Sequence, residues 1–413
     1  MSLEHQAEIL KLARVLDVDT LALAMLQEVD AASIRQLRLQ AVKRIHIGDA
    51  PIFKRIVSAS RLLPVPVLAL IAEKVMGSLI TARIAGQMDV ERGVGIASRL
   101  QIGYLADVCL HLDPAQAREL IRAIPQRQIV AVAQELAARD ECVAMGRFVD
   151  ILSEASIMAV VDVLDDAQLL RTAFFVENKQ RLDSIIEHFA PERLIAIIRC
   201  AASDADLWPE ALGLMRHLNP TLRGRLANLA ASLDTDVLSS MLRSVSAHGL
   251  WSDALPIIAD MSEESQSRFA NLPDIQQTDV LLDIISFACA EGLWPDVLPL
   301  VRLMDDAGKT ACAQAAEYLD GEQLLSLVRA ASDHSMWGDV LDLVQRMNEP
   351  QKYEIVALMG MAPQAIVDTM LPAIDVSNYW DLLLPAWPKM TTVGRDRLRQ
   401  AAGKINQEGK LPA

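Results

Sequence analysis

Apolar positions in the C-terminal half of the chain recur with the spacing of one helix face. Before Trp294 they stand at i, i+3, i+4 and i+7, as Leu281, Ile284, Ile285 and Ala288. Before Trp251 the same intervals hold Leu238, Met241, Leu242 and Val245. This periodicity is typical of an amphipathic helix that buries one stripe. We therefore predict a helix upstream of each tryptophan.

The tryptophans themselves mark a repeat. Five of the six follow one another at intervals of 43 residues: Trp208, Trp251, Trp294, Trp337 and Trp380. Eleven residues after each stands a helix-capping residue: Asn219, Ser262, Asp305, Asn348 and Thr391. Such side chains accept hydrogen bonds from the free N–H groups at a helix N-terminus. Each unit is predicted to hold a helix A, a corner at the tryptophan, a short helix B and a helix C.

The start of helix B is indicated by an acidic position two residues after the tryptophan. It holds Glu210, Asp253, Asp296 and Asp339, and Leu382 breaks the series. Helix capping explains these acids, and a binding ladder for cationic groups is the alternative. If Asp253 and Asp296 are N-caps, Pro256 and Pro299 fall at the third helical position, where proline is tolerated. Helix B is then about two turns long.

A unit of this length cannot bury its own apolar face, but stacked neighbours can. We predict an all-α fold: an α-solenoid, right-handed or irregular, with five units over residues 189–403, a less regular helical array or lobe over 1–188, and a polar tail over 404–413. The unit length resembles that of armadillo and HEAT repeat proteins. The stretch from Gly292 to Met304 also resembles helix B of tetratrico- and pentatricopeptide repeats. These resemblances imply an architecture and no catalytic motif.

One stretch of the first half resembles the helical hairpins of the intracellular N domain of magnesium transporters. It runs from Leu105 through Leu112-Asp113-Pro114 and from Ala117 to Ile124-Pro125. The channel and cystathionine-synthase-type domains of that family are not found in the sequence. The resemblance implies helical hairpins and does not imply magnesium transport.

Composition narrows the class of protein. The 413 residues carry 39 Lys and Arg against 54 Asp and Glu, a net charge of −15, and 52% are apolar but only 4% aromatic. A chain this apolar is not disordered, and its acidity argues against binding nucleic acid or anionic membrane over the whole surface.

The longest apolar run, about 62–72, is interrupted by two prolines, so we expect no membrane span. We expect no secretory signal at the N-terminus, because Met1–Leu10 has no apolar core, and five dispersed cysteines suggest reduced thiols in the cytoplasm.

A basic row stands fifteen residues after each tryptophan. It consists of Arg223, Gln266, Lys309, Lys352 and Arg395, and Arg225, Arg268 and Arg397 follow two residues further along. These positions fall in the first turns of helix C, where cations gain nothing from the helix dipole. In armadillo-like stacks the third helix lines the concave groove. The row therefore predicts a site for an extended acidic or polar segment of a protein partner; the alternative is a solvated row, or one paired with the acidic caps of the next unit.

Charge is also uneven along the chain, because residues 1–100 sum to +3 and the remainder to −18. Within 31–61, seven cations face Asp49 alone: Arg35, Arg38, Lys43, Arg44, Lys54, Arg55 and Arg61. This segment could dock on an acidic partner, nucleic acid, an anionic membrane, or the acidic repeats of another copy. The alternative is a solvated helix face. No aromatic residues are interleaved to stack on bases, so nucleic acid is the less favoured partner.

These patterns favour a cytoplasmic scaffold that binds a protein segment. A nucleic-acid or membrane-surface binder acting through 31–61 is one alternative. The other is an enzyme or small-ligand binder whose site forms only between the two halves. We find no catalytic motif, and we expect no cofactor or metal; oligomeric state is left open. The tryptophans are expected to be wedged in the core, with an exposed aromatic row gripping a ligand as the alternative.

Overall fold

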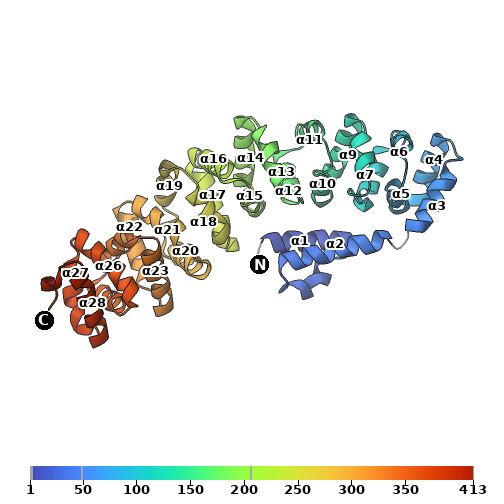
Figure 1. Ribbon diagram of the computed structural model, residues 1–413. Helices are drawn as coiled ribbons and strands as arrows, with labels where there is room; N and C mark the ends of the chain where they lie inside the picture. Colours follow the sequence, from blue (N-terminus) through green and yellow to red (C-terminus); the bar gives the residue numbers. More distant parts are fainter. Residues whose placement is uncertain (1–2, 48–49, 205–206, 413) are drawn as a thin grey trace. The chain divides into compact units, whose positions relative to one another are not determined.

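The computed structural model describes residues 3–47, 50–204 and 207–412, and over these residues it contains helices and turns but no strand (Figure 1). The predicted all-α fold is confirmed. The chain divides into two compact units, Met1–Asn219 and Pro220–Ala413. The sequence placed a boundary at 188. The structure divides 31 residues later, because helices A and B of the first 43-residue period pack with the N-terminal half.

The first unit starts with a helical hairpin that has its own core. Helices α1 (Leu3–Leu16) and α2 (Ala31–Ile47) lie side by side, joined by the 3₁₀ segment η1 (Thr20–Leu26). Between them lie Leu12, Ala13, Leu23 and Ile34. The hairpin docks on the rest of the unit through α1, which contacts α10 (Cys142–Phe148) and α15 (Trp208–Met215). A side chain at Gly213 would meet Leu3, so the glycine permits this close approach.

The remainder of the first unit is a row of short helices. They are α3 (Ala50–Ser60), α4 (Val65–Ile71), the π-helical turn η2 (Ala72–Met76), α5 (Gly77–Ala85), α6 (Val90–Ala97), α7 (Ile102–His111), α8 (Arg118–Ala123), α9 (Gln126–Ala138), α11 (Glu154–Val161), α12 (Asp166–Phe174), α13 (Gln180–Glu187) and α14 (Pro191–Ser203), with α10 and α15 as given above. Along the row α5, α7, α9 and α11 pack successively, as do α4, α6 and α8. Small apolar cores fill the spaces between successive layers.

The second unit continues the order helix C, helix A, helix B. The C helices are α16 (Pro220–Ser232), α19 (Glu263–Ala270), α22 (Asp306–Ala316), α25 (Glu349–Gly360) and α28 (Thr392–Lys404). The A helices are α17 (Thr235–His248), α20 (Thr278–Glu291), α23 (Gly321–Asp333) and α26 (Gln364–Val376). The B helices are α18 (Trp251–Ala259), α21 (Trp294–Leu303), α24 (Trp337–Arg346) and α27 (Trp380–Ala386). Helices of one type stack on the same type in the next period: α18, α21 and α24 do so, as do α20, α23 and α26.

Each tryptophan is the first residue of a B helix, and all five are at most 6% exposed. The indole Nε1 of Trp294 donates to Ser326 Oγ at 3.0 Å, and that of Trp337 donates to Thr369 Oγ1 at 3.1 Å. Both acceptors lie on the A helix of the next period. All five tryptophans are therefore core residues, as predicted, and do not form an exposed aromatic row; those at 294 and 337 also join successive periods.

In four periods the corner before the tryptophan is made by a residue with positive φ. Gly249, Gly292, Ser335 and Asn378 have φ values of 63°, 70°, 58° and 56°. The next residue then donates its N–H back into helix A, at 2.9 Å in all four periods. This is the left-handed helix ending that favours glycine or asparagine. The signal for it stands two residues before the last four tryptophans in the sequence, as Gly, Gly, Ser and Asn, but the tryptophan interval alone did not predict it.

The predicted N-caps of helix C are confirmed at four positions. The side chains of Ser262, Asp305, Asn348 and Thr391 accept from the backbone N–H three residues on. The predicted caps of helix B are wrong: α18 and α21 begin at the tryptophan, because the tight corner already directs the chain into the helix. Asp253 and Asp296 thus lie in the first turn, and Pro256 and Pro299 lie inside the helix.

The C-terminal tail is folded onto the last period. A 3₁₀ turn, η5 (Glu408–Lys410), follows α28, and Lys410 Nζ lies 3.1 Å from Asp375 Oδ1 and 5.0 Å from the centre of the Trp380 ring. Trp380 itself donates to Asp375 at 2.9 Å. Lys410 of the polar tail therefore contacts the start of the final B helix.

Candidate functional site

The arginines of the helix C row are largely engaged within the chain. Arg268 donates to the backbone oxygens of Ala231 and Leu233, both at 2.6 Å, at the end of the preceding C helix. Arg397 donates in the same way to Met361 and Ala362, at 2.6 and 2.9 Å. Carbonyls at the end of a helix have no partner within it. These guanidinium groups thus tie one period to the next.

The other members of the row behave differently from one another. Arg223 pairs with Asp260, Gln266 donates to the carbonyls of Ile258 and Ala259, and Arg395 donates to those of Trp387 and Pro388. Lys309 lies 3.8 Å from Asp342, with its side chain 20% exposed. Arg225 is exposed, while Lys352 is half-buried. The row therefore does not present a continuous set of exposed cations.

The acidic row of helix B is likewise tied into the fold. Asp253 is buried, and burial raises the pKa of Asp296, with a further contribution from Asp260. Asp339 accepts hydrogen bonds from Nε and Nη2 of Arg302, at 2.9 and 2.7 Å; the arginine belongs to the preceding period. These acids lie at the helix N-terminus, where the dipole favours a negative charge. The geometry gives them no common point around which a ligand would bind.

Two of the seven cations of the basic segment belong to a buried ion cluster. Arg38 is 4% exposed, and its guanidinium lies 2.9 Å from Glu8 Oε2 and 3.0 Å from Glu177 Oε1. Lys11 lies 3.2 Å from Glu8 and 3.5 Å from Glu177, and Arg35 lies 3.6 Å from Glu177. Glu177 follows α12, whereas the other four residues belong to the hairpin. The cluster therefore holds the hairpin to the row of helices.

Burial and charge act in opposite directions in this cluster. Burial tends to raise the pKa of Glu177, but Lys11 and Arg38 outweigh it and hold that pKa below its ordinary value. Nearby, burial lowers the pKa of Lys179 to about 7, with Lys11 adding to the effect. Lys179 donates to the carbonyl oxygens of Ala173 and Phe174, at the end of α12. The cluster was not predicted from the sequence. Its signal was the charged pair at positions 8 and 11, which lies beside the apolar residues Leu3, Ala7 and Leu12 of the same helix.

The remaining cations of the segment lie on an exposed surface that is rich in aliphatic side chains. We call this surface the basic apolar end. Its exposed cations are Lys43, Arg44, Lys54, Arg55, Arg61 and Lys74. Its most exposed aliphatic side chains are Leu62 at 87%, Val75 at 78%, Leu70 at 60% and Ile52 at 58%. Figure 1 shows α3 and α4, which carry Ile52, Lys54, Arg55 and Leu70, at one end of the helical row of the first unit. The other residues lie at the end of α2, in the loop after α3 and in η2.

The concentration of exposed apolar residues there is unusual. Nine of the twenty-two large hydrophobic side chains exposed among the described residues lie within 43–80, and seven more lie before residue 43, in the N-terminal hairpin. Surface hydrophobic residues scattered singly are ordinary, but a contiguous patch marks an interaction site. Within this end, Arg92 donates to the carbonyl oxygens of Ser60 and Leu63, and Arg83 lies 5.8 Å from the centre of the Phe53 ring. These contacts fix α3 and the loop after it to α5 and α6.

One stretch of the basic apolar end is long and apolar enough to cross a membrane. Residues Val65–Ala85 have a mean hydropathy of 1.6, and only 17% of the most apolar window is buried. The backbone is interrupted by the π-helical turn η2 and by Gly77, whose φ is +75°. A single such helix is weak evidence for a span. The exposed aliphatic side chains at 62–80 were not predicted. Their signal in the sequence was the apolar run 62–72, which two prolines interrupt.

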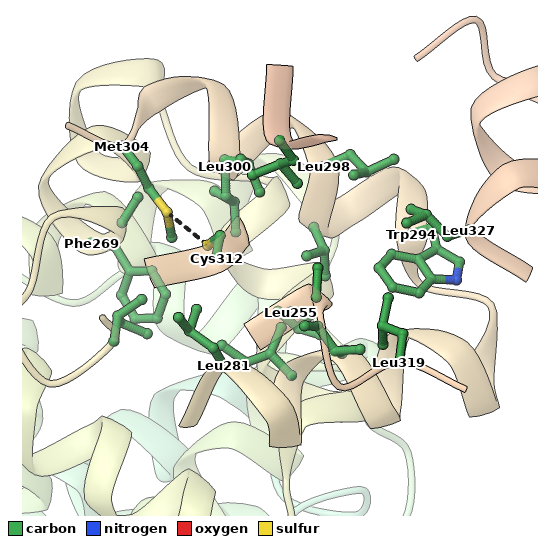
Figure 2. A pocket seen from close by; sticks show the side chains of 18 residues that line it. Leu255, Phe269, Leu281, Trp294, Leu298, Leu300, Met304, Cys312, Leu319 and Leu327 are labelled. Atoms are coloured by element: carbon green, nitrogen blue, oxygen red, sulfur yellow. Dashed lines mark hydrogen bonds between the residues drawn. The ribbon is translucent and has the colours of Figure 1, made fainter. Parts of the chain in front are cut away.

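The second unit encloses an apolar cavity of about 60 Å³ between periods (Figure 2). Phe269, Leu281, Leu298 and Trp294 are among the side chains that surround it, and they leave almost no polar surface inside. Cys312 Sγ lies 3.3 Å from Met304 Sδ in the wall, and burial raises the pKa of that thiol to about 12. A cavity with such walls stays dry. We interpret it as a packing space of the core.

Over the residues that the structure describes, no three His, Cys, Asp or Glu side chains are grouped as they would be to hold a metal ion. No protein-family model matches the chain, and the comparison with curated proteins finds no significant match. The expectations of no cofactor and no catalytic site stay predictions. The basic apolar end is accordingly the candidate interface.

Proposed function

We propose that this chain is an interaction scaffold of the α-solenoid type, which attaches to an acidic partner surface through its basic apolar end. The stacking of like helices at 43-residue intervals supports the solenoid, in the manner of armadillo and HEAT repeats. The observation that carries the docking surface is the gathering of exposed cations and exposed aliphatic side chains over residues 43–80. Five free cysteines are compatible with a cytoplasmic scaffold.

This proposal moves the interface away from the helix C row. Arg268 and Arg397 tie periods together, so their charges are already used within the chain. Lys54, Arg55 and Arg61, by contrast, are exposed and belong to a segment of 55 residues, 31–85, in which nine cations meet two acids. The remainder of the chain is acidic. An acidic partner is thus attracted to one end and repelled elsewhere, which orients the scaffold on it.

The test is affinity capture with the full chain and two charge-matched variants. One variant is Lys54→Glu/Arg55→Glu/Arg61→Glu; the control is Arg127→Glu/Arg243→Glu/Arg329→Glu, at exposed arginines elsewhere. We expect wild type and control to retain an acidic partner that the first variant loses. Identical captures by all three proteins would contradict the proposal. Loss in Lys309→Glu/Lys352→Glu alone would return the interface to the helix C row.

A further inference from the structure

The basic apolar end combines two kinds of surface that a single partner must satisfy. Its aliphatic side chains are among the most exposed in the molecule, with Leu62 at 87% and Val75 at 78%. Its cations lie between them along the same elements, at positions 54, 55 and 61 on one side of Leu62 and at 74 beside Val75. Glu73, an acid in this stretch, lies 3.1 Å from Lys74. We propose that the end binds the surface of an anionic lipid bilayer, an inference that rests on the proposed function and names its partner.

The backbone favours lying in the interface over crossing the membrane. Helix α4 has seven residues and begins after Pro64, and Gly77, the first residue of α5, has φ +75° and interrupts the helical backbone after η2. Exposed Lys74 and half-buried Arg83 stand within the same 21 residues. Spanning would place these charges in hydrocarbon. In the interface, the aliphatic side chains enter the acyl boundary while the cations remain among the headgroups.

A second copy of the chain fits this surface poorly. If two basic apolar ends met around a twofold axis, Lys54, Arg55 and Arg61 would face the same cations of the other copy. If the end met the acidic repeats instead, its aliphatic side chains would need an apolar counterpart. The large hydrophobic side chains exposed among the described residues of the second unit are only Tyr318, Leu358, Val376, Leu384 and Val393. A bilayer with anionic headgroups supplies both negative charge and an apolar layer.

Nucleic acid and a protein partner are also less well matched. Nucleic acid would neutralise the cations but leave Leu62, Leu70 and Val75 in water, with no exposed aromatic side chain among them for stacking. Protein interfaces are enriched in aromatic residues, Met and Arg at their centre. Here the most exposed apolar side chains are Leu, Ile and Val. That composition, with Lys and Arg on the polar side, is typical of segments that bind at membrane surfaces.

The test is flotation of the full chain with lipid vesicles. The two kinds of vesicle are pure phosphatidylcholine and phosphatidylcholine with about one third phosphatidylglycerol. We expect wild type to float with the anionic vesicles only, and less so as salt is raised. Lys54→Glu/Arg55→Glu/Arg61→Glu should lower the partition coefficient by roughly 100-fold or more, since each cation near the surface contributes about fivefold. Leu62→Asp/Leu70→Asp should also abolish flotation, whereas Arg127→Glu/Arg243→Glu/Arg329→Glu should float like wild type.

Several outcomes would overturn the inference. One is wild type that stays with the bottom fraction in the presence of anionic vesicles. Another is an equal loss in the control variant, which would show a response to net charge alone. If wild type fails to float but its capture of an acidic protein still depends on residues 54, 55 and 61, the scaffold proposal stands and the bilayer is wrong. If sedimentation velocity shows a dimer that Leu62→Asp/Leu70→Asp dissociates, with no flotation, the partner is a second copy.

Discussion

The buried ion cluster makes a quantitative prediction about the N-terminal hairpin. Arg38 lies between Glu8 and Glu177, and its side chain is 5% exposed. In Arg38→Met, two poorly solvated carboxylates keep only Lys11, at 3.2 and 3.5 Å, and the more distant Arg35. Breaking a buried ion pair from one side costs about 3–5 kcal/mol, because a charge remains without its partner. We expect a loss of this size in the docking of the hairpin.

Arg35 supplies the control, because it lies one helical turn earlier and faces the same carboxylate. Its side chain is 51% exposed and lies 3.6 Å from Glu177. Exposed ion pairs of this kind contribute below about 1 kcal/mol. Arg35→Met should therefore change the docking far less than Arg38→Met. Both substitutions remove one positive charge, so a response to net charge cannot produce the difference.

Hydrogen exchange read by mass spectrometry measures the effect locally. The hairpin has its own core of Leu12, Ala13, Leu23 and Ile34, so its release need not unfold the rest. Arg38→Met should speed exchange over residues 3–45 and around 173–182, and leave 220–413 unchanged. Adding Glu177→Gln should recover part of the loss, since one stranded charge is removed. Equal effects of Arg35→Met and Arg38→Met, or a change spread evenly over the chain, would refute the reasoning.

Three further predictions concern Arg268, Glu177 and Cys312. Arg268→Met leaves the carbonyls of Ala231 and Leu233 without their donor and should lower the free energy of unfolding of the second unit by about 1–3 kcal/mol, as measured by denaturant titration. The control Arg243→Met, at an exposed arginine, should lower it by less than about 0.5 kcal/mol. Glu177 has a folded-state pKa below its ordinary 4.5, so its stabilisation of the hairpin is present at neutral pH and is lost as the pH falls below about 4.5 and through the folded-state value. Hydrogen exchange over residues 3–45, measured from pH 6 to 3 and corrected for intrinsic rates, should therefore become faster in this pH range. An unchanged corrected rate would count against the cluster. With a pKa of about 12, roughly 10⁻⁴ of the Cys312 thiol is ionised at pH 8, so native alkylation at that residue should be at least about a hundredfold slower than in denaturant; comparable rates would mean that the core opens.

The sequence predicted the helices better than their surfaces. The tryptophan interval and the polar residue eleven positions later are local signals, and they located the starts of α19, α22, α25 and α28. The start of helix B was misplaced by three residues because its corner depends on a positive φ at Gly249 and Gly292. Acids two residues after the tryptophan are equally consistent with a cap and with a first helical turn. Only the backbone distinguishes the two.

The ion cluster could not be predicted, because Glu177 is separated from Arg38 by 139 residues. No periodicity links positions so far apart when one lies in a hairpin and the other in a loop. The basic segment 31–61 was correctly identified as cationic, but the sequence did not show that Arg38 is buried whereas Lys54 and Arg55 are exposed. Which cations are available to a partner is decided by the docking of the hairpin.

The contrast between the two basic regions has a physical origin in helix length. Helices of seven to fourteen residues in the second unit create a helix end about every fourteen residues along each 43-residue period. Every helix end leaves carbonyls without partners in the helix. An arginine one period further on, such as Arg268 or Arg397, is long enough to donate to them. A basic row at the repeat interval is therefore what short stacked helices require for their own cohesion. At the basic apolar end the cations are outside the repeat register, exposed, and accompanied by exposed aliphatic side chains. Cohesion does not account for that combination, which is the basis of the proposed attachment to an anionic surface.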